Sequence, residues 1–167
     1  MNKIFRFKTQ DEWVQAIVDH LIFAAIRAVH DRGIFRLGLS GGSTPTPVYQ
    51  ALALVKNFPW SQTELFLVDE RIVELDDERS NYRMVQENLI ERLPQASKAF
   101  VFFDTRLSSD EALSQYQRHL DYAALDVVLL GIGTDGHTAS LFPNSKLLEV
   151  QNQWIMETEP AGNPFIP

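Results

Sequence analysis

The sequence predicts an α/β protein: a Rossmann-like, mostly parallel sheet with helices on both faces. Short apolar segments alternate with segments of helical periodicity along most of the 167 residues. The segments between them are of crossover length, and no short hairpin turn joins two neighbouring strands. This alternation is typical of parallel sheets covered on both faces, in which ligands bind outside the carboxyl ends of the strands. We therefore expect residues 1–167 to form a single α/β domain.

The expected elements begin with a short strand at residues 4–7. Thr9 and Glu12 have the spacing of a capping box, so a long helix should start there and end at Gly33. Thr44 as N-cap with Pro45 at the first helical position predicts a second helix, to about Val55. Further strands are expected at residues 34–39, 64–68, 99–103, 126–130 and 153–157, and further helices from Ser80 to Leu93 before Pro94 and from Ser108 to Tyr122.

The last segment, residues 160–167, reads as a loop that contains apolar residues. A domain rarely stops on a loop directly after a strand. We therefore expect the fold to be C-terminally incomplete at Pro167, with further strands and a helix to follow.

Composition excludes several classes of function. The net charge of −7 disfavours nucleic acid as a partner, because phosphate backbones require clustered Lys and Arg. The absence of cysteine excludes disulfides, thiolate zinc sites and cysteine nucleophiles. The sequence has no apolar run of about 18 residues and no apolar signal-peptide core, so we expect a cytoplasmic protein with no membrane contact. No spacing of histidines and acids indicates a metal site.

The first candidate loop follows the strand at 34–39 and reads SGGSTP. Its glycines and the following helix N-terminus could form an anion cradle, with hydroxyl groups as further donors. The same residues match G-x-S-x-G, the nucleophile elbow of α/β-hydrolases, but the expected helix starts four residues too late. An ordinary strand-to-helix turn is the third interpretation. The cradle is the favoured one, and its residues are Ser40, Gly41, Gly42, Ser43 and Thr44.

The second candidate loop, residues 69–71, reads Asp-Glu-Arg and ends the strand at 64–68. Arg71 could bind a phosphate or an oxyanion with two parallel hydrogen bonds. A salt bridge to nearby acids explains it equally well. Arg79 is interpreted as structural, and the acidic segment 74–78 as a solvated loop.

The third candidate loop is GIGTDGH, which follows the buried strand at 126–130. It matches the dinucleotide fingerprint G-x-G-x-x-G, with Glu157 near the place of a ribose-binding acid. That fingerprint needs a full helix after its last glycine, and Pro143 leaves room for a short one at most. A dinucleotide site is therefore disfavoured.

His137 is the candidate general base of this loop, because a neutral imidazole titrates near pH 7. Asp135, two residues earlier, could orient the ring or serve as a turn residue. The other histidines lie in expected helices and are interpreted as structural: His20, His30 and His119.

Together, LSGGSTP, VDER with SNY downstream, and GIGTDGHTASLFP resemble the 6-phosphogluconolactonase family of the pentose phosphate pathway. The resemblance covers nearly the whole chain in the right order. The chain is similar, more distantly, to glucosamine-6-phosphate deaminase. Arg71, which replaces an aromatic residue of the deaminases, and the sequence after Gly136-His137 favour the lactonases.

The resemblance implies hydrolysis of 6-phospho-D-glucono-1,5-lactone to 6-phosphogluconate without metal or cofactor. It assigns the general base to His137 and the phosphate or substrate contacts to the SGGST loop and Arg71. On this mechanism Asp135 would hold the imidazole, and Asp69 or Glu70 would shape the pocket. Backbone N–H groups from Gly133 to Gly136 could serve the oxyanion.

The expected partner is a small phosphorylated sugar lactone, and the protein is expected to be a monomer or a weak homo-oligomer. Three other functions stay open. They are a deaminase-like isomerase, a serine hydrolase that uses Ser40, and a sugar-phosphate-binding module without catalysis.

Overall fold

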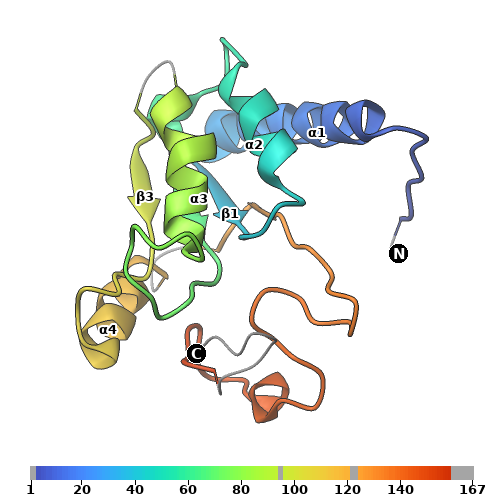
Figure 1. Cartoon of the computed structure of the whole chain (residues 1–167). Helices are drawn as coiled ribbons and strands as arrows, with labels where there is room; N and C mark the ends of the chain where they lie inside the picture. Colours follow the sequence, from blue (N-terminus) through green and yellow to red (C-terminus); the bar gives the residue numbers. More distant parts are fainter. Residues whose placement is uncertain (1–2, 94–95, 121–123, 159–167) are drawn as a thin grey trace.

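The computed structural model describes residues 3–93, 96–120 and 124–158. Its centre is a four-stranded sheet in the order β3-β2-β1-β4, and all three strand pairs are parallel. The strands are β1 (Phe35–Leu39), β2 (Thr63–Leu67), β3 (Ala99–Val101) and β4 (Val127–Val128). The parallel α/β architecture expected from the sequence is confirmed, and Figure 1 shows how the helices surround this sheet.

Helices cover both faces of the sheet. Three pack against one face: α1 (Gln10–Arg32), α2 (Thr46–Ala53) and α3 (Asn81–Asn88). The fourth, α4 (Ser109–Leu120), lies apart from them in Figure 1 and packs against the other face. Strand alternation explains the division, since successive side chains point to opposite faces. Leu65 and Leu67 of β2 join the core under α1 to α3, whereas Phe66 contacts Tyr116 of α4.

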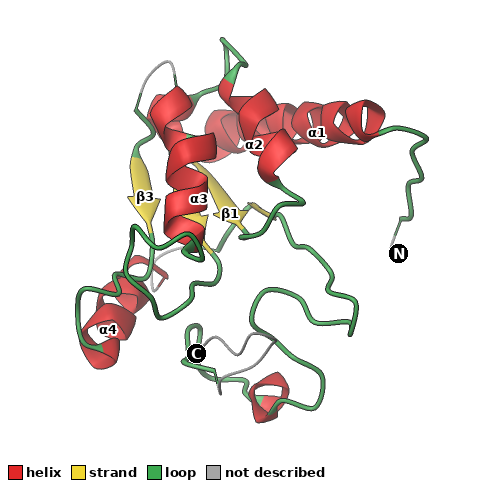
Figure 2. Cartoon of the chain, viewed as in Figure 1, coloured by secondary structure: helices red, strands yellow, loops and turns green. Residues whose placement is uncertain are grey.

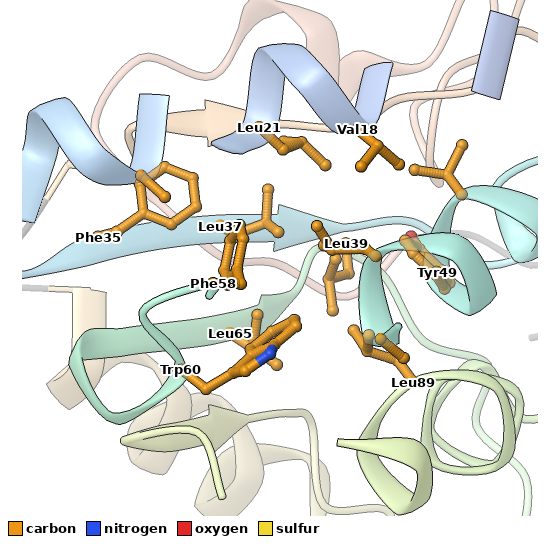
Figure 3. Packing of buried hydrophobic residues seen from close by; sticks show 14 of the residues in the cluster. Val18, Leu21, Phe35, Leu37, Leu39, Tyr49, Phe58, Trp60, Leu65 and Leu89 are labelled. Carbon is orange, nitrogen blue, oxygen red and sulfur yellow. The ribbon is translucent and has the colours of Figure 1, made fainter. Parts of the chain in front are cut away.

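The main core lies between β1, β2 and the first three helices. In Figure 3, Val18 and Leu21 of α1 lie over Leu37 and Leu39 of β1, all four of them buried. Aromatic side chains also fill this core, and the ring centroids of Phe58 and Trp60 lie 4.4 Å apart. The buried stripe along α1 is what its helical spacing predicts.

The predicted caps of α1 are confirmed. The Oγ1 of Thr9 accepts a hydrogen bond of 3.2 Å from the backbone N of Glu12. Gly33 ends the helix with a φ of 75°, a left-handed conformation that glycine adopts without strain. In α4, the Oγ of Ser108 donates to the Glu111 carboxylate at 2.6 Å, so this pair also lies at a helix start as expected.

Two expected strands are absent, and two helix ends are displaced. Residues 4–7 are extended and exposed, and residues 153–157 form no ladder, so both strand predictions are wrong. A strand needs a neighbour to satisfy its backbone groups, and no described residue pairs with either segment. The second helix starts at Thr46 with Pro45 as N-cap, not at Pro45 with Thr44 as cap. The third stops at Asn88 and continues as a short 3₁₀ turn, η2 (Ile90–Arg92).

The strand β4 is shorter than the predicted 126–130, but its backbone bonding extends beyond two residues. The N of Asp126 donates to Arg36 O at 2.9 Å, and the N of Leu129 donates to Gly38 O at 3.0 Å. The carboxylate of Asp126 also pairs with Arg32 at the end of α1. Beyond β4, the described chain is mainly loop with one short helix, η3 (Lys146–Glu149), as Figure 2 shows.

Three sequence-based expectations lie outside the described residues: the stop at Pro94, the end of the fourth helix at Tyr122, and the terminal loop 160–167. Among the helices of the described part, none is both long enough and apolar enough to cross a membrane.

Gly38 in β1 gives a direct test of this packing. A Cβ on Gly38 would lie 2.9 Å from Val68 Cγ1 and 3.0 Å from Val128 Cγ1. Overpacking of this kind should make Gly38→Ala less stable by about 1–3 kcal/mol in urea unfolding. Gly131→Ala is the matched control, since a Cβ there meets nothing within 4 Å, and its effect should stay within about 0.5 kcal/mol. Equal stability of the two variants would contradict the packing of β4 on β1.

Candidate active site

The three candidate loops follow β1, β2 and β4, and the carboxyl ends of parallel strands meet at one edge of the sheet. Two side-chain hydrogen bonds link them. The Oγ of Ser40 donates to Leu129 O at 2.7 Å, which ties the first loop to the start of the third. The Oγ of Ser140 donates to Asp69 Oδ2 at 3.0 Å, which ties the third loop to the second. The fold therefore assembles these sequence-distant loops into one site.

Ser40 is buried and holds the backbone in place. Its carbonyl accepts a hydrogen bond of 2.7 Å from Tyr49 OH, and its own hydroxyl is used on Leu129. An elbow serine presents its Oγ at the start of a helix. Here α2 starts at Thr46, after an intervening turn, and the Oγ of Ser40 points to a carbonyl. The geometry of a nucleophile elbow is thus not present at this serine.

The rest of the first loop combines close backbone packing with an exposed turn. A Cβ on Gly41 would lie 1.8 Å from Asn81 Oδ1, so only glycine fits there. Gly42 has a φ of 88°, which favours glycine as well. Ser43 and Thr44 are exposed in the turn before α2. This arrangement is compatible with an anion cradle.

Glu70 caps the N-terminus of α3. Its carboxylate accepts hydrogen bonds from the backbone N of Asn81 and of Tyr82, both at 2.7 Å, and from Ser80 Oγ at 3.2 Å. It also accepts from the backbone N of Arg71 at 2.8 Å. Burial raises the pKa of this carboxyl, although the four hydrogen bonds oppose the shift. The carboxylate of Glu70 is thus used at the start of α3, and its pocket-shaping role stays a prediction.

Arg71 forms no salt bridge within the described residues. Its Nη1 donates to Arg79 O at 2.7 Å and to Asn81 Oδ1, both neutral acceptors. In the described part of the chain, Nε and Nη2 have no recorded partner. The salt-bridge interpretation is therefore wrong for the described residues, and this half-buried cation keeps donors that no described residue uses. Arg79 instead pairs with Asp77 at 2.7 Å, in agreement with its structural interpretation.

Asp69 has one engaged and one free carboxylate oxygen. Oδ2 accepts from Ser140, whereas Oδ1 is buried and has no hydrogen-bond partner among the described atoms. Burial raises the pKa of Tyr49 and of Tyr116, and the nearby Asp69 charge adds to both shifts. Asp69 also lines a largely apolar cleft of about 940 Å³ between β2, α4 and residues 139–158.

His137 and Asp135 form a pair in the third loop. The Nδ1 of His137 lies 2.5 Å from Asp135 Oδ1, and the backbone N of His137 donates to the same oxygen at 3.1 Å. The ring of Phe142 packs against the imidazole with the centroids 4.8 Å apart. The histidine side chain is 35% exposed.

The glycines of this loop allow the pair to form. A Cβ on Gly133 would lie 2.2 Å from the His137 ring, and Gly136 has a φ of 90°. The backbone N of Gly133 donates to His137 O at 2.8 Å, and that of Gly136 donates to Gly133 O at 3.0 Å. Both amides are thus engaged within the loop, and their use for an oxyanion stays a prediction.

The loop is not a dinucleotide fingerprint. No helix follows Gly136; instead, Thr138 and Leu141 close a tight turn with an isolated bridge. Ala139 within this turn has a φ of 49°, an uncommon conformation for a residue with a Cβ. The turn directs Ser140 to Asp69.

The structure brings the loops together but does not place every predicted residue in mutual contact. Among the described residues, no hydrogen bond or ion pair joins His137 to Arg71 or to Ser43 and Thr44. No group of three or more described His, Asp or Glu residues is arranged to hold a metal ion. The other three histidines, His20, His30 and His119, are exposed on α1 and α4, and His30 pairs with Asp31.

Two residues of this site were missed by sequence reasoning as site residues. Asn81 contacts Gly41, Arg71 and Asp69 at once, and Ser140 links the second and third loops. Both residues lie in segments that carry the family resemblance, Asn81 in SNY and Ser140 in GIGTDGHTASLFP, and these motifs were the signal that could have identified them.

The fold is that of a parallel α/β protein, a class in which ligands bind outside the carboxyl ends of the strands. Comparison with known proteins makes the class specific. Residues 8–165 match the family described as glucosamine-6-phosphate isomerases/6-phosphogluconolactonase. The chain belongs to this family.

Its relatives include proteins named 6-phosphogluconolactonase. One, from Thermotoga maritima, is 34% identical, and the match covers 100% of this chain and 76% of that protein. Another, from a Nostoc species, is 39% identical over 83% of this chain and 62% of its own length. A rabbit (Oryctolagus cuniculus) protein named GDH/6PGL endoplasmic bifunctional protein is 39% identical over 92% of this chain and 21% of its own length.

Solved structures agree. The crystal structure of 6-phosphogluconolactonase from Thermotoga maritima has a TM-score of 0.83 at 34% identity, over 95% of this chain and 72% of that one. The enzyme of the same name from Trypanosoma brucei has a TM-score of 0.75 at 28% identity, over 87% of this chain and 65% of that one. The chain thus spans about two thirds to three quarters of these lactonases and about a fifth of the bifunctional protein.

The Asp135–His137 pair should make the third loop sensitive to acid. Hydrogen bonds from the His137 backbone and ring lower the pKa of the Asp135 carboxyl below its ordinary value of 3.8. Because the folded-state pKa is lowered, the ionised carboxylate contributes its full stabilisation of the loop above pH 3.8. This stabilisation is lost as the pH falls through the lowered pKa. We expect the amide NMR signals of residues 133–138 to titrate below pH 3.8. In Asp135→Asn this titration should disappear; its persistence would contradict the pairing.

Proposed function

We propose that this protein hydrolyses 6-phospho-D-glucono-1,5-lactone to 6-phosphogluconate, with His137 as the general base. The observation that carries the proposal is the Asp135–His137 pair at the same sheet edge as Arg71, a cation without a carboxylate partner among the described residues. The names of its relatives support the same reaction.

The pair has the arrangement that a general base requires. With the Nδ1 proton directed at Asp135, the Nε2 lone pair is left to accept a proton from water. A lactone ring is already activated, so the reaction needs a positioned water, a base for its proton and donors for the developing oxyanion. Asp135 would fix the tautomer and stabilise the imidazolium that forms in the transition state.

The phosphate would bind at the opposite end of the substrate. Arg71 offers Nε and Nη2 as a fork, and the turn with Gly42, Ser43 and Thr44 offers backbone and hydroxyl donors. Anchoring a remote phosphate supplies orientation, because binding energy far from the reacting carbon positions the lactone for attack. Asp69 Oδ1, buried and without a described partner, would accept a hydrogen bond from a sugar hydroxyl.

An aldose–ketose isomerase with deaminase activity is the second candidate, because the family description includes glucosamine-6-phosphate isomerases. Release of ammonia from glucosamine 6-phosphate separates the two. We expect no ammonia above background, since the lactonases are the relatives whose names recur at 33 to 39% identity. A sugar-phosphate-binding module would bind 6-phosphogluconate without accelerating ring opening.

The base assignment is tested with His137→Ala in a coupled assay that detects 6-phosphogluconate above spontaneous hydrolysis. Loss of the proton acceptor should lower kcat by about 10²–10⁴-fold, whereas binding of 6-phosphogluconate should change little. His20→Ala is the matched control, because His20 is exposed on α1 and far from the loops along the chain. A kcat of His137→Ala within about twofold of the parent would refute the assignment.

A further inference from the structure

We infer that Asn81 is the positioning residue of the phosphate site: its side-chain amide orients the guanidinium of Arg71 without neutralising its charge. The inference rests on the proposed function in that it takes the anion at Arg71 to be the substrate phosphate. Asn81 was assigned no role by the sequence motifs. Its side chain is 1% exposed at the start of α3.

The amide of Asn81 lies between Arg71, Asp69 and Gly41. Its Oδ1 accepts from Arg71 Nη1, and its Nδ2 donates to Asp69 O at 2.9 Å. The amide also occupies the space over Gly41, where a Cβ would lie 1.8 Å from Oδ1 and 2.1 Å from Cγ. One planar group therefore fixes the distance between the cradle loop and the guanidinium.

This side chain does not serve the helix that carries it. The N-terminus of α3 is capped by Ser80, whose Oγ accepts from the backbone N of Arg83 at 3.2 Å, and by the Glu70 carboxylate. None of the recorded bonds of the Asn81 amide reaches the α3 backbone. A purely structural role in helix capping thus leaves the amide unexplained.

The neutrality of Asn81 matters because it leaves the charge of Arg71 available. Both acceptors of Nη1 are uncharged, and the neighbouring Glu70 carboxylate is turned into the helix start, where four donors surround it. An amide oxygen orients a guanidinium without neutralising it, whereas a carboxylate would compete with an incoming phosphate. The site thus holds Arg71 by hydrogen bonds and reserves its ionic attraction for the ligand.

The decisive variant is Asn81→Asp, which keeps the shape of the side chain and adds a negative charge beside Arg71. We expect the Kd for inorganic phosphate, measured by calorimetry on the full chain, to rise about tenfold or more. The KM for the phosphorylated lactone should rise by a similar factor, while turnover of unphosphorylated glucono-1,5-lactone should change less than about threefold.

Asn88→Asp is the matched control, because Asn88 lies at the other end of α3 and also forms two hydrogen bonds, with Gln50 and with Met84 O. It should leave phosphate binding within about twofold of the parent. If Asn81→Asp fails to fold, Asn81→Ala tests the same contact, because it removes both hydrogen bonds of the amide and leaves the cradle residues unchanged. It should give the same split between phosphorylated and unphosphorylated lactone.

Parent-like phosphate affinity and an unchanged KM in Asn81→Asp would overturn the inference. So would an equal loss for both lactones in the folded variants, because a merely structural role predicts that outcome. The proposed function fails separately: a parent protein that binds phosphate but hydrolyses no lactone would contradict the reaction, and the calorimetric comparison would still decide the role of Asn81.

Discussion

Parallel pairing of β1 with both β2 and β4 is the constraint on which the site depends. Because the three strands run in the same direction, their carboxyl ends meet at one edge, and so do the loops that follow them. Gly38 allows the close approach of β4, since Val68 and Val128 leave no room for a larger side chain. Bonds from Ser40 to Leu129 and from Ser140 to Asp69 then fix the loops relative to one another. The side chains of each loop are given by its own sequence, but the loops come together because the strands before them are parallel neighbours.

Local patterns in the sequence predicted those parts of the molecule that local physics decides. The cap of α1, the alternation of strands with helices and the three loops at the sheet edge all follow from neighbours along the chain. The strands expected at 4–7 and 153–157 failed because a strand exists only with a pairing partner, and the sequence does not say which partner is there. Asn81 was missed for a similar reason. It lies in the SNY motif, but its contacts with Gly41, Arg71 and Asp69 join separate segments of the chain, and the motif alone does not say which segments meet.

An acidic protein can still attract an anion if its cations are left without partners at the right place. The net charge is −7, yet Arg71 has no carboxylate partner among the described residues. Glu70, the nearest acid along the chain, is occupied by four donors around the start of α3. Arg79, by contrast, is paired with Asp77 on the surface. Local pairing therefore decides which arginine can bind a ligand, and the overall charge does not.

The two ends of the proposed site differ in how firmly the fold holds them. The anion end rests on the main core, through Ser40, Tyr49 and Asn81, all of which are buried. The histidine end lies beyond β4 in a segment with much less packing: Leu130 is 53% exposed and Ile132 is 83% exposed. Its position depends on polar ties, chiefly the bond from Ser140 to Asp69, which the unusual backbone of Ala139 directs. A substrate bound at the anion end can use part of its binding energy to order the loop that carries the histidine. A ligand that spans both ends adds contacts that the free protein lacks. On the proposed function, the phosphate would link the better-packed half of the site to the proposed base, His137.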